Sequence, residues 1–231
     1  MNQSTTNYSV PRIAHGGGGF KGHSYTNSIE ALSYNYDRGF RYFELDFSWT
    51  ADNYLACIHD WQSYSSIPTL AEFIDNNDRN DNWCRCHLDS VITWLDDYPS
   101  TYIVTDIKDN NLKGLALIAS QYPQYIDRFI PQIYQPQELA KIQKLGFKRI
   151  IWTLYLYEGS NEQVIEEAQN MRGDLYAVTM PIARAESGLA ISLNKLNLPC
   201  YVHTINDLSG LSNMMNENGI SNIYTDFLSV I

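Results

Sequence analysis

The feature that most constrains the fold is a repeating order: short apolar segments alternate with segments of helical periodicity along almost the whole chain. We expect strands at residues 11–15, 41–48, 101–107, 129–134, 149–155, 175–180, 200–205 and 222–225. A helix after each strand indicates a parallel sheet, because every helix returns the chain to the edge where the next strand begins. Eight such units in 231 residues predict an α/β protein, a (β/α)8 TIM barrel that forms a single domain over residues 1–231. An open, doubly wound sheet is the alternative.

The helices are marked by the spacing of apolar residues and by residues that favour helix ends. Asn27, with Glu30 three residues later, predicts an N-terminal capping box, and Gly39 ends that helix. Asn161 and Asp207 are expected to cap two later helices. Further helical segments are expected at residues 88–98, 112–119, 136–145 and 184–197.

Composition excludes some classes of partner. The net charge of −10 argues against nucleic acid or an anionic membrane surface as the main partner. The chain contains no run near eighteen apolar residues, so we expect no transmembrane segment. The first twelve residues lack the basic and apolar regions of a signal peptide, which favours a cytoplasmic location unless a leader has been removed.

Residues 61–87 are polar and irregular, and we expect an excursion after the second strand with one short helix over residues 69–76. The excursion ends in Cys84-Arg85-Cys86-His87. This cysteine spacing is tighter than that of a zinc knuckle and no second pair follows, so zinc is not expected there. Cys57 and Cys200 lie in apolar segments and are expected to be buried thiols.

The second strand carries two carboxylates on one face. Side chains two apart on a strand point the same way, so Glu44 and Asp46 lie side by side while Phe43 and Phe47 face the core. Adjacent carboxylates repel unless a positive charge lies between them. A divalent cation with oxygen ligands fits that place. The same pattern would also suit an edge strand with one face in water.

Other polar residues fall at or near the C-terminal ends of predicted strands, where a TIM barrel collects its active site. They are His15, Asp106 and Asp226, and Lys108 follows Asp106 on the same face. The alternative for Asp106 and Lys108 is a structural ion pair with the carboxylates of the second strand.

The glycine-rich loop at residues 17–22 formally matches the dinucleotide fingerprint G-x-G-x-x-G. That fingerprint needs a helix that opens within the glycines, and here the expected cap comes several residues too late. A nucleotide-binding oxidoreductase is therefore the least favoured function.

Four aromatic residues could line an apolar substrate wall or belong to the core. They are Trp61, Tyr134, Trp152 and Tyr155.

Six short stretches follow one another along the chain: Ile13-Ala14-His15-Gly16, Asn27-Ser28, Glu44-Leu45-Asp46, His59-Asp60, Asp106-Ile107-Lys108 and Tyr224-Thr225-Asp226. In this order they resemble the glycerophosphodiester phosphodiesterase family of phospholipase C-like TIM-barrel phosphodiesterases. The resemblance covers the whole chain. The ordered set of stretches, and not any one of them, carries the resemblance.

The resemblance implies a role for each matching residue. It implies Glu44, Asp46 and Asp106 as ligands of one divalent cation, Mg²⁺ or Ca²⁺. It implies His15 and His59 as the catalytic acid and base. Lys108 is expected to contact the phosphate.

The chain departs from the family pattern in its first loop and at the third ligand. Gly16 stands where the family has Arg, and residues 25–28 read Tyr-Thr-Asn-Ser where the family has Pro-Glu-Asn-Thr. Lys21 is a candidate substitute for the missing arginine. Asp106 replaces the usual Glu, and this resembles sphingomyelinase D-like phospholipases more closely.

The expected function is a metal-dependent phosphodiesterase that cleaves glycerophosphodiesters or related phospholipid head groups by acid–base catalysis with two histidines. Its expected substrate is a small phosphodiester or lysophospholipid, with Lys108, Lys21 and Trp152 in substrate contact. One alternative is a sphingomyelinase D-like phospholipase or lyase that gives a cyclic phosphate. Another is a catalytically silent barrel that binds phosphoesters.

Overall fold

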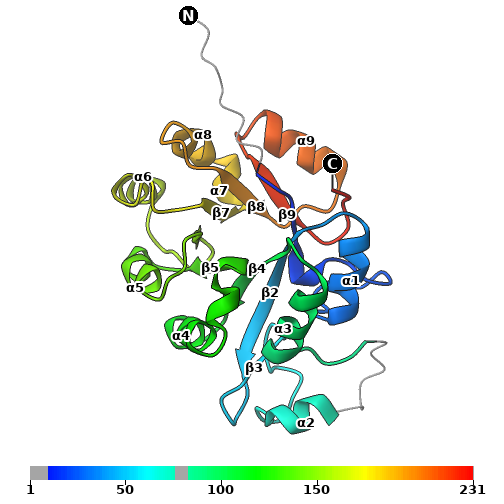
Figure 1. Cartoon of the computed structure of the whole chain (residues 1–231). Coiled ribbons are helices and arrows are strands. Elements are labelled where there is room, and N and C mark those ends of the chain that lie inside the picture. The colour runs from blue at the N-terminus through cyan, green and yellow to red at the C-terminus, as the bar shows by residue number, and fades with distance from the viewer. Residues whose placement is uncertain (1–9, 76–82, 231) are drawn as a thin grey trace, which may run out of the picture.

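The computed structural model describes residues 10–75 and 83–230 and has a closed barrel of eight parallel strands (Figure 1). The strands are β1 (Ile13–Ala14), β2 (Tyr42–Trp49), β4 (Tyr102–Ile107), β5 (Phe129–Ile133), β6 (Ile151–Thr153), β7 (Ala177–Pro181), β8 (Cys200–His203) and β9 (Asn222–Thr225). β1 pairs in parallel with both β2 and β9, and this double pairing closes the ring. The predicted TIM barrel is confirmed, and the open sheet is excluded.

Helices surround the ring of strands (Figure 1). They are α1 (Ile29–Asp37), α2 (Leu70–Asp75), α3 (Leu88–Asp97), α4 (Asn111–Gln121), α5 (Leu139–Lys144), α6 (Asn161–Asn170), α7 (Ile182–Glu186), α8 (Leu189–Asn194) and α9 (Leu208–Asn216). The helix expected over residues 69–76 is α2; residue 76 and the rest of the excursion up to residue 82 lie outside the described part of the chain. Among the described residues, no helix has both the length and the apolar character needed to cross a bilayer.

Two apolar clusters hold the barrel together. One fills its interior and includes Ile13, Val104 and Ile151. The other lies between strands and helices and includes Phe43 and Trp152. Strand residues alternate between the two clusters because successive side chains point to opposite faces. The alternation leaves inward positions further along the strands free for polar residues.

Three predicted helix boundaries differ from the structure. Ser28, and not Asn27, is the N-cap of α1, and its hydroxyl accepts the N–H of Ala31. Ser160, and not Asn161, caps α6 in the same way. The helix expected over residues 184–197 is divided into α7 and α8, because Gly188 has φ +83° and interrupts helical geometry. Asp207 caps α9 as predicted.

A short strand outside the barrel places the segment that follows β2. β3 (Leu55–Ala56) pairs antiparallel with the end of β2, where Ser48 lies opposite Ala56. The Ser48 hydroxyl donates to the carbonyl oxygens of Ile58 and His59 at 3.0 and 3.2 Å. These contacts hold the chain beside the barrel mouth as it reaches His59.

Candidate active site

Three carboxylates meet inside the C-terminal mouth of the barrel. Asp46 of β2 pairs in register with Asp106 of β4, and Glu44 precedes Asp46 by two residues on the same face. One oxygen from each carboxylate lies within 4.8 Å of the others. The three residues are only 2%, 2% and 6% exposed. The structure therefore brings together the residues predicted as metal ligands.

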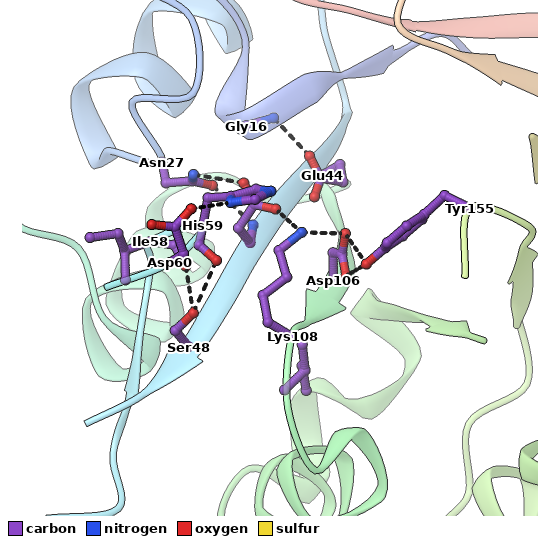
Figure 2. A network of polar contacts seen from close by, with 12 residues as sticks. Gly16, Asn27, Glu44, Ser48, Ile58, His59, Asp60, Asp106, Lys108 and Tyr155 are labelled. Atoms are coloured by element: carbon purple, nitrogen blue, oxygen red, sulfur yellow. Dashed lines mark hydrogen bonds and ion pairs between the residues drawn. The ribbon is translucent and has the colours of Figure 1, made fainter. Parts of the chain in front are cut away.

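Neutral donors from the first loop fix two of these carboxylates (Figure 2). The N–H of Gly16 donates to Oε2 of Glu44 at 2.8 Å. The Asn27 side chain contacts Asp46 twice: its amide donates to Oδ2 at 2.9 Å, and its oxygen accepts the Asp46 N–H at 2.9 Å. Asn27 thus fixes a carboxylate at the mouth, which explains why it does not cap α1.

Two tyrosines fix the third carboxylate. The hydroxyl of Tyr134 donates to Oδ1 of Asp106, and the hydroxyl of Tyr155 lies 3.0 Å from the same oxygen. Burial and the charge of Asp106 raise the pKa of both hydroxyls, so they remain donors at neutral pH. The sequence suggested that these rings line an apolar substrate wall or belong to the core. In the structure their hydroxyl groups contact the carboxylate of Asp106.

Lys108 lies between two of the acids (Figure 2). Its ammonium contacts Oδ1 of Asp46 at 2.6 Å and Oδ2 of Asp106 at 2.7 Å. Burial alone would lower the pKa of Lys108, but the charges of Asp106 and Asp46 outweigh it and raise the pKa far above its usual value. Lys108 is therefore a fixed positive charge at the mouth.

The site also fits a divalent cation. When all three carboxylates are ionised, they outweigh the Lys108 ammonium by two negative charges within a buried space. Burial, and then repulsion by Asp46, raise the pKa of Glu44 to about 8. A cation with two positive charges would remove this excess, and hard oxygen donors are what Mg²⁺ and Ca²⁺ prefer. Within the part of the chain that the structure describes, one group of three side chains could hold a metal ion. It consists of Glu44, Asp46 and Asp106.

His15 is held in a hydrogen-bonded chain across the closure of the barrel. Its Nδ1 lies 2.9 Å from Oδ1 of Asp226, and Asn206 donates to Oδ2 of Asp226 at 2.7 Å. Burial lowers the pKa of His15, but the hydrogen bond with Asp226 and the charges of Glu44 and Asp226 raise it to about 8. His15 is therefore largely protonated at neutral pH.

His59 lies on the outer side of the mouth. Its side chain is 53% exposed, and its Nδ1 contacts Oδ2 of Asp60 at 2.8 Å. The ring of Tyr25 lies against both histidines, with centroid distances of 4.5 Å to His15 and 5.9 Å to His59. The two predicted catalytic histidines are thus on the same side of the mouth, with an aromatic ring between them.

A third histidine at the mouth was not predicted. His203 ends β8, and its Nδ1 lies 2.9 Å from the hydroxyl of Thr179. Burial, with the nearby positive charges of His15 and Lys108, lowers its pKa to about 4, so it is neutral. The signal in the sequence was its place in the C-terminal half of the strand predicted over residues 200–205.

The glycine-rich loop serves to present His15. Gly16, Gly17 and Gly18 all have positive φ, and the N–H of Gly19 donates to the carbonyl of Asp226 at 2.6 Å. α1 opens only at Ile29, well beyond the glycines. The helix therefore does not open within the glycines, as a dinucleotide fingerprint would need.

Two predicted substrate contacts are not brought to the carboxylates. Trp152 has no exposed surface and packs against Tyr157 in the cluster between strands and helices, so its prediction as a substrate contact is wrong. Lys21 is exposed on the glycine-rich loop, and its ammonium lies 5.1 Å from the ring centroid of Phe20. A phosphate contact by Lys21 stays a prediction.

A scan of protein-family models gives no match to this chain, and a search of curated proteins gives none either. Solved structures share the fold at low sequence identity. A glycerophosphodiester phosphodiesterase from Thermotoga maritima is 20% identical, with a TM-score of 0.71 and 93% of each chain covered. One from Parabacteroides distasonis is 17% identical, with a TM-score of 0.73, covering 94% of this chain and 93% of that one.

A phosphodiesterase from Oleispira antarctica, solved with its product sn-glycerol-3-phosphate, is also similar to this chain. It is 14% identical, has a TM-score of 0.69, and covers 97% of this chain and 96% of its own. The likeness extends over almost the whole length of each of the three chains.

Proposed function

We propose that the chain is a metal-dependent phosphodiesterase that cleaves small glycerophosphodiesters or related phospholipid head groups. The observation that carries the proposal is the arrangement at the mouth: two histidines on one side of a buried group of three carboxylates. Phosphodiester cleavage needs charge stabilisation at the phosphoryl oxygens and proton transfer at two oxygens, and this arrangement offers groups for both. The shared fold with phosphodiesterases, one of them bound to sn-glycerol-3-phosphate, supports it.

The carboxylates would hold one divalent cation, Mg²⁺ or Ca²⁺, through Glu44, Asp46 and Asp106. When bound, such a cation polarises phosphoryl oxygens and offsets the charge that develops on them. Asn27 and the N–H of Gly16 keep the carboxylates oriented for it. The Lys108 ammonium adds a second positive charge for the phosphate.

The histidines would divide the proton transfers. His15 is protonated at neutral pH and is suited to give a proton to the leaving alkoxide. His59 would take the proton from the nucleophile, and Asp60 orients its ring through Nδ1. Asp226 has the same orienting role for His15.

The test is a pair of single variants, His15→Ala and His59→Ala, assayed on one glycerophosphodiester with Mg²⁺ or Ca²⁺. We expect each to lower kcat/KM on the order of 10²–10⁴-fold, the usual effect of a positioned acid or base. Cation affinity should be unchanged in both, since neither histidine is assigned as a ligand. His87→Ala is the control, because His87 lies at the start of α3, outside the barrel mouth.

Product analysis separates the alternatives. Hydrolysis gives a phosphomonoester and an alcohol, whereas a lyase gives a cyclic phosphate from a lysophospholipid. A chain that binds these esters but turns over none of them would contradict the proposal and favour a silent, phosphoester-binding barrel. Near-normal turnover in His15→Ala would contradict the role of the two histidines.

A further inference from the structure

Cys57 and Cys86 face each other across a short antiparallel pairing outside the barrel. Ala56 and His87 form an antiparallel bridge, and the N–H of Cys57 donates to the carbonyl of Cys86 at 2.8 Å. One step along this pairing, Cys57 stands opposite Cys86. The Cα atoms of opposite residues in such a pair lie about 4.5–5.5 Å apart. That separation is within the range that a disulfide spans.

Their side chains also meet. The two sulfur atoms lie 2.6 Å apart. Both residues are buried, at 3% and 1% exposure, within the apolar cluster between strands and helices. The other two cysteines stand apart from this contact: Cys84 is exposed, and the Cys200 thiol lies 3.5 Å from the carbonyl of Leu198.

We propose that Cys57 and Cys86 are a site of covalent modification, an intrachain disulfide that ties the segment carrying His59 to the segment that leads into α3. Cys57 is two residues before His59, and Cys86 is two residues before the first residue of α3. The bond would join two segments that the backbone holds together by one short pairing.

The chemistry is a thiol–disulfide exchange with a small disulfide such as oxidised glutathione. The thiolate of one cysteine attacks the glutathione disulfide, breaks its S–S bond and releases one glutathione thiolate. The second cysteine then attacks the mixed disulfide, forms the bond between Cys57 and Cys86, and releases the other glutathione. Two protein thiols are oxidised, one disulfide is reduced, and the two thiol protons pass to glutathione.

The bond would matter for the mouth because Cys57 lies only two residues before His59. The hydroxyl of Ser48 holds the carbonyls of Ile58 and His59, but the side chain of His59 is more than half exposed. A crosslink two residues away limits how far this segment can move. This consequence for catalysis rests on the proposed function, whereas the bond itself does not.

The experiment incubates the purified full chain in oxidised glutathione or in reductant and then maps the thiols. Intact mass should show the loss of two hydrogen atoms on oxidation, and titration of the unfolded chain should fall from four thiols to two. Digestion without reductant should give one linked peptide pair containing Cys57 and Cys86. The melting temperature of the oxidised chain should be higher by about 5–10 °C, as expected for closing a loop of this size.

Matched variants make the result specific. In the double variant Cys84→Ser/Cys200→Ser only the proposed pair remains, and oxidation should still form the bond and raise the melting temperature. In Cys57→Ser the shift should vanish. Four titratable thiols after oxidation of the parent, or a linked peptide that contains Cys84, would overturn the proposal. Mapping does not use catalysis, so a chain with the bond and no phosphodiesterase activity would refute the proposed function alone.

Discussion

At the residue scale, uncharged side chains help to hold the charged ones in place. The carboxylate of Asp46 is fixed by Asn27, and that of Asp226 by Asn206. The charged residues could be predicted because strand periodicity and strand ends mark them. Their partners could not, because Asn27 and Asn206 reach the mouth from loops, and a loop asparagine is equally common as a cap or turn residue.

Asp226→Asn is the sharpest test of the partner of His15. The substitution keeps the shape but removes a negative charge and changes the hydrogen bond, so the pKa of His15 should fall from about 8 towards its ordinary value of 6.5. NMR titration of His15 measures this directly. If His15 is the proton donor, the basic limb of the kcat/KM profile should move to lower pH by the same interval. Turnover should fall on the order of 10²-fold or more. A His15 titration that is unchanged would show that Asp226 does not set its protonation.

At the element scale, the register of β2 against β4 is what makes the carboxylate cluster. Asp46 and Asp106 are far apart in sequence but are partners in the sheet. The alternation of strands and helices was enough to predict the barrel and the end of each strand that carries the site. The alternation could not predict the length of each strand, such as the three residues of β6. Where the hydrogen bonds of a strand end depends on the curvature of the barrel and on the neighbouring strands, and not on local sequence.

The start of α1 gives a matched pair of neighbouring substitutions. Asn27→Ala removes both contacts with Asp46, and cation affinity should fall about 10–100-fold, the usual effect of losing a group that orients a ligand. Ser28→Ala removes the cap of the helix instead. It should cost about 1 kcal/mol of folding stability and leave cation affinity unchanged. Calorimetric titration with Ca²⁺ and denaturant unfolding measure the two effects, and equal effects from both variants would contradict this division of roles.

The first loop is built around a residue without a side chain. Gly16 has φ +56°, and a Cβ added there would lie 3.0 Å from the Cα of Tyr25. Gly16→Arg would supply the arginine of the resembled family, yet we expect it to destabilise the fold by about 1–3 kcal/mol and not to raise activity. Gly22→Arg is the control, because a Cβ at Gly22 meets nothing within 4 Å, although its φ is also positive. Higher turnover in Gly16→Arg at unchanged stability would show that the loop tolerates the family residue.

At the scale of the whole molecule, the excess of acid over base is partly concentrated inside the barrel. The net charge is −10, and Glu44, Asp46 and Asp106 are buried together at one end. The sequence revealed both the charge and the cluster but not the burial, which depends on closure between β1 and β9. Burial is what makes the cluster costly to the folded state when no cation balances it.

Without a bound cation, this cost makes the stability of the folded protein depend on pH. The pKa of Glu44 is raised from 4.5 to about 8 in the folded protein, and that of His15 from 6.5 to about 8. Above pH 4.5 the unfolded chain releases the Glu44 proton while the folded chain retains it, so the free energy of unfolding falls as pH rises. The stabilising contribution of protonated His15 is complete below pH 6.5 and is lost as pH rises through 8. Both effects have the same sign, and the cation-free protein should lose on the order of 10 °C in melting temperature between pH 5 and pH 8.5.

A bound divalent cation should reverse this dependence. It binds the deprotonated carboxylates, so its affinity should rise with pH and saturating Ca²⁺ or Mg²⁺ should restore the melting temperature most strongly near pH 8. Glu44→Gln is the matched variant, because it keeps the size of the side chain and removes its titration. In that variant the melting temperature should vary less with pH and respond less to the cation. Thermal unfolding by circular dichroism over this pH range, with chelator or with cation, measures all four curves. A cation-free parent with a flat curve, or a Glu44→Gln curve as steep as that of the parent, would exclude Glu44 as the source of the dependence.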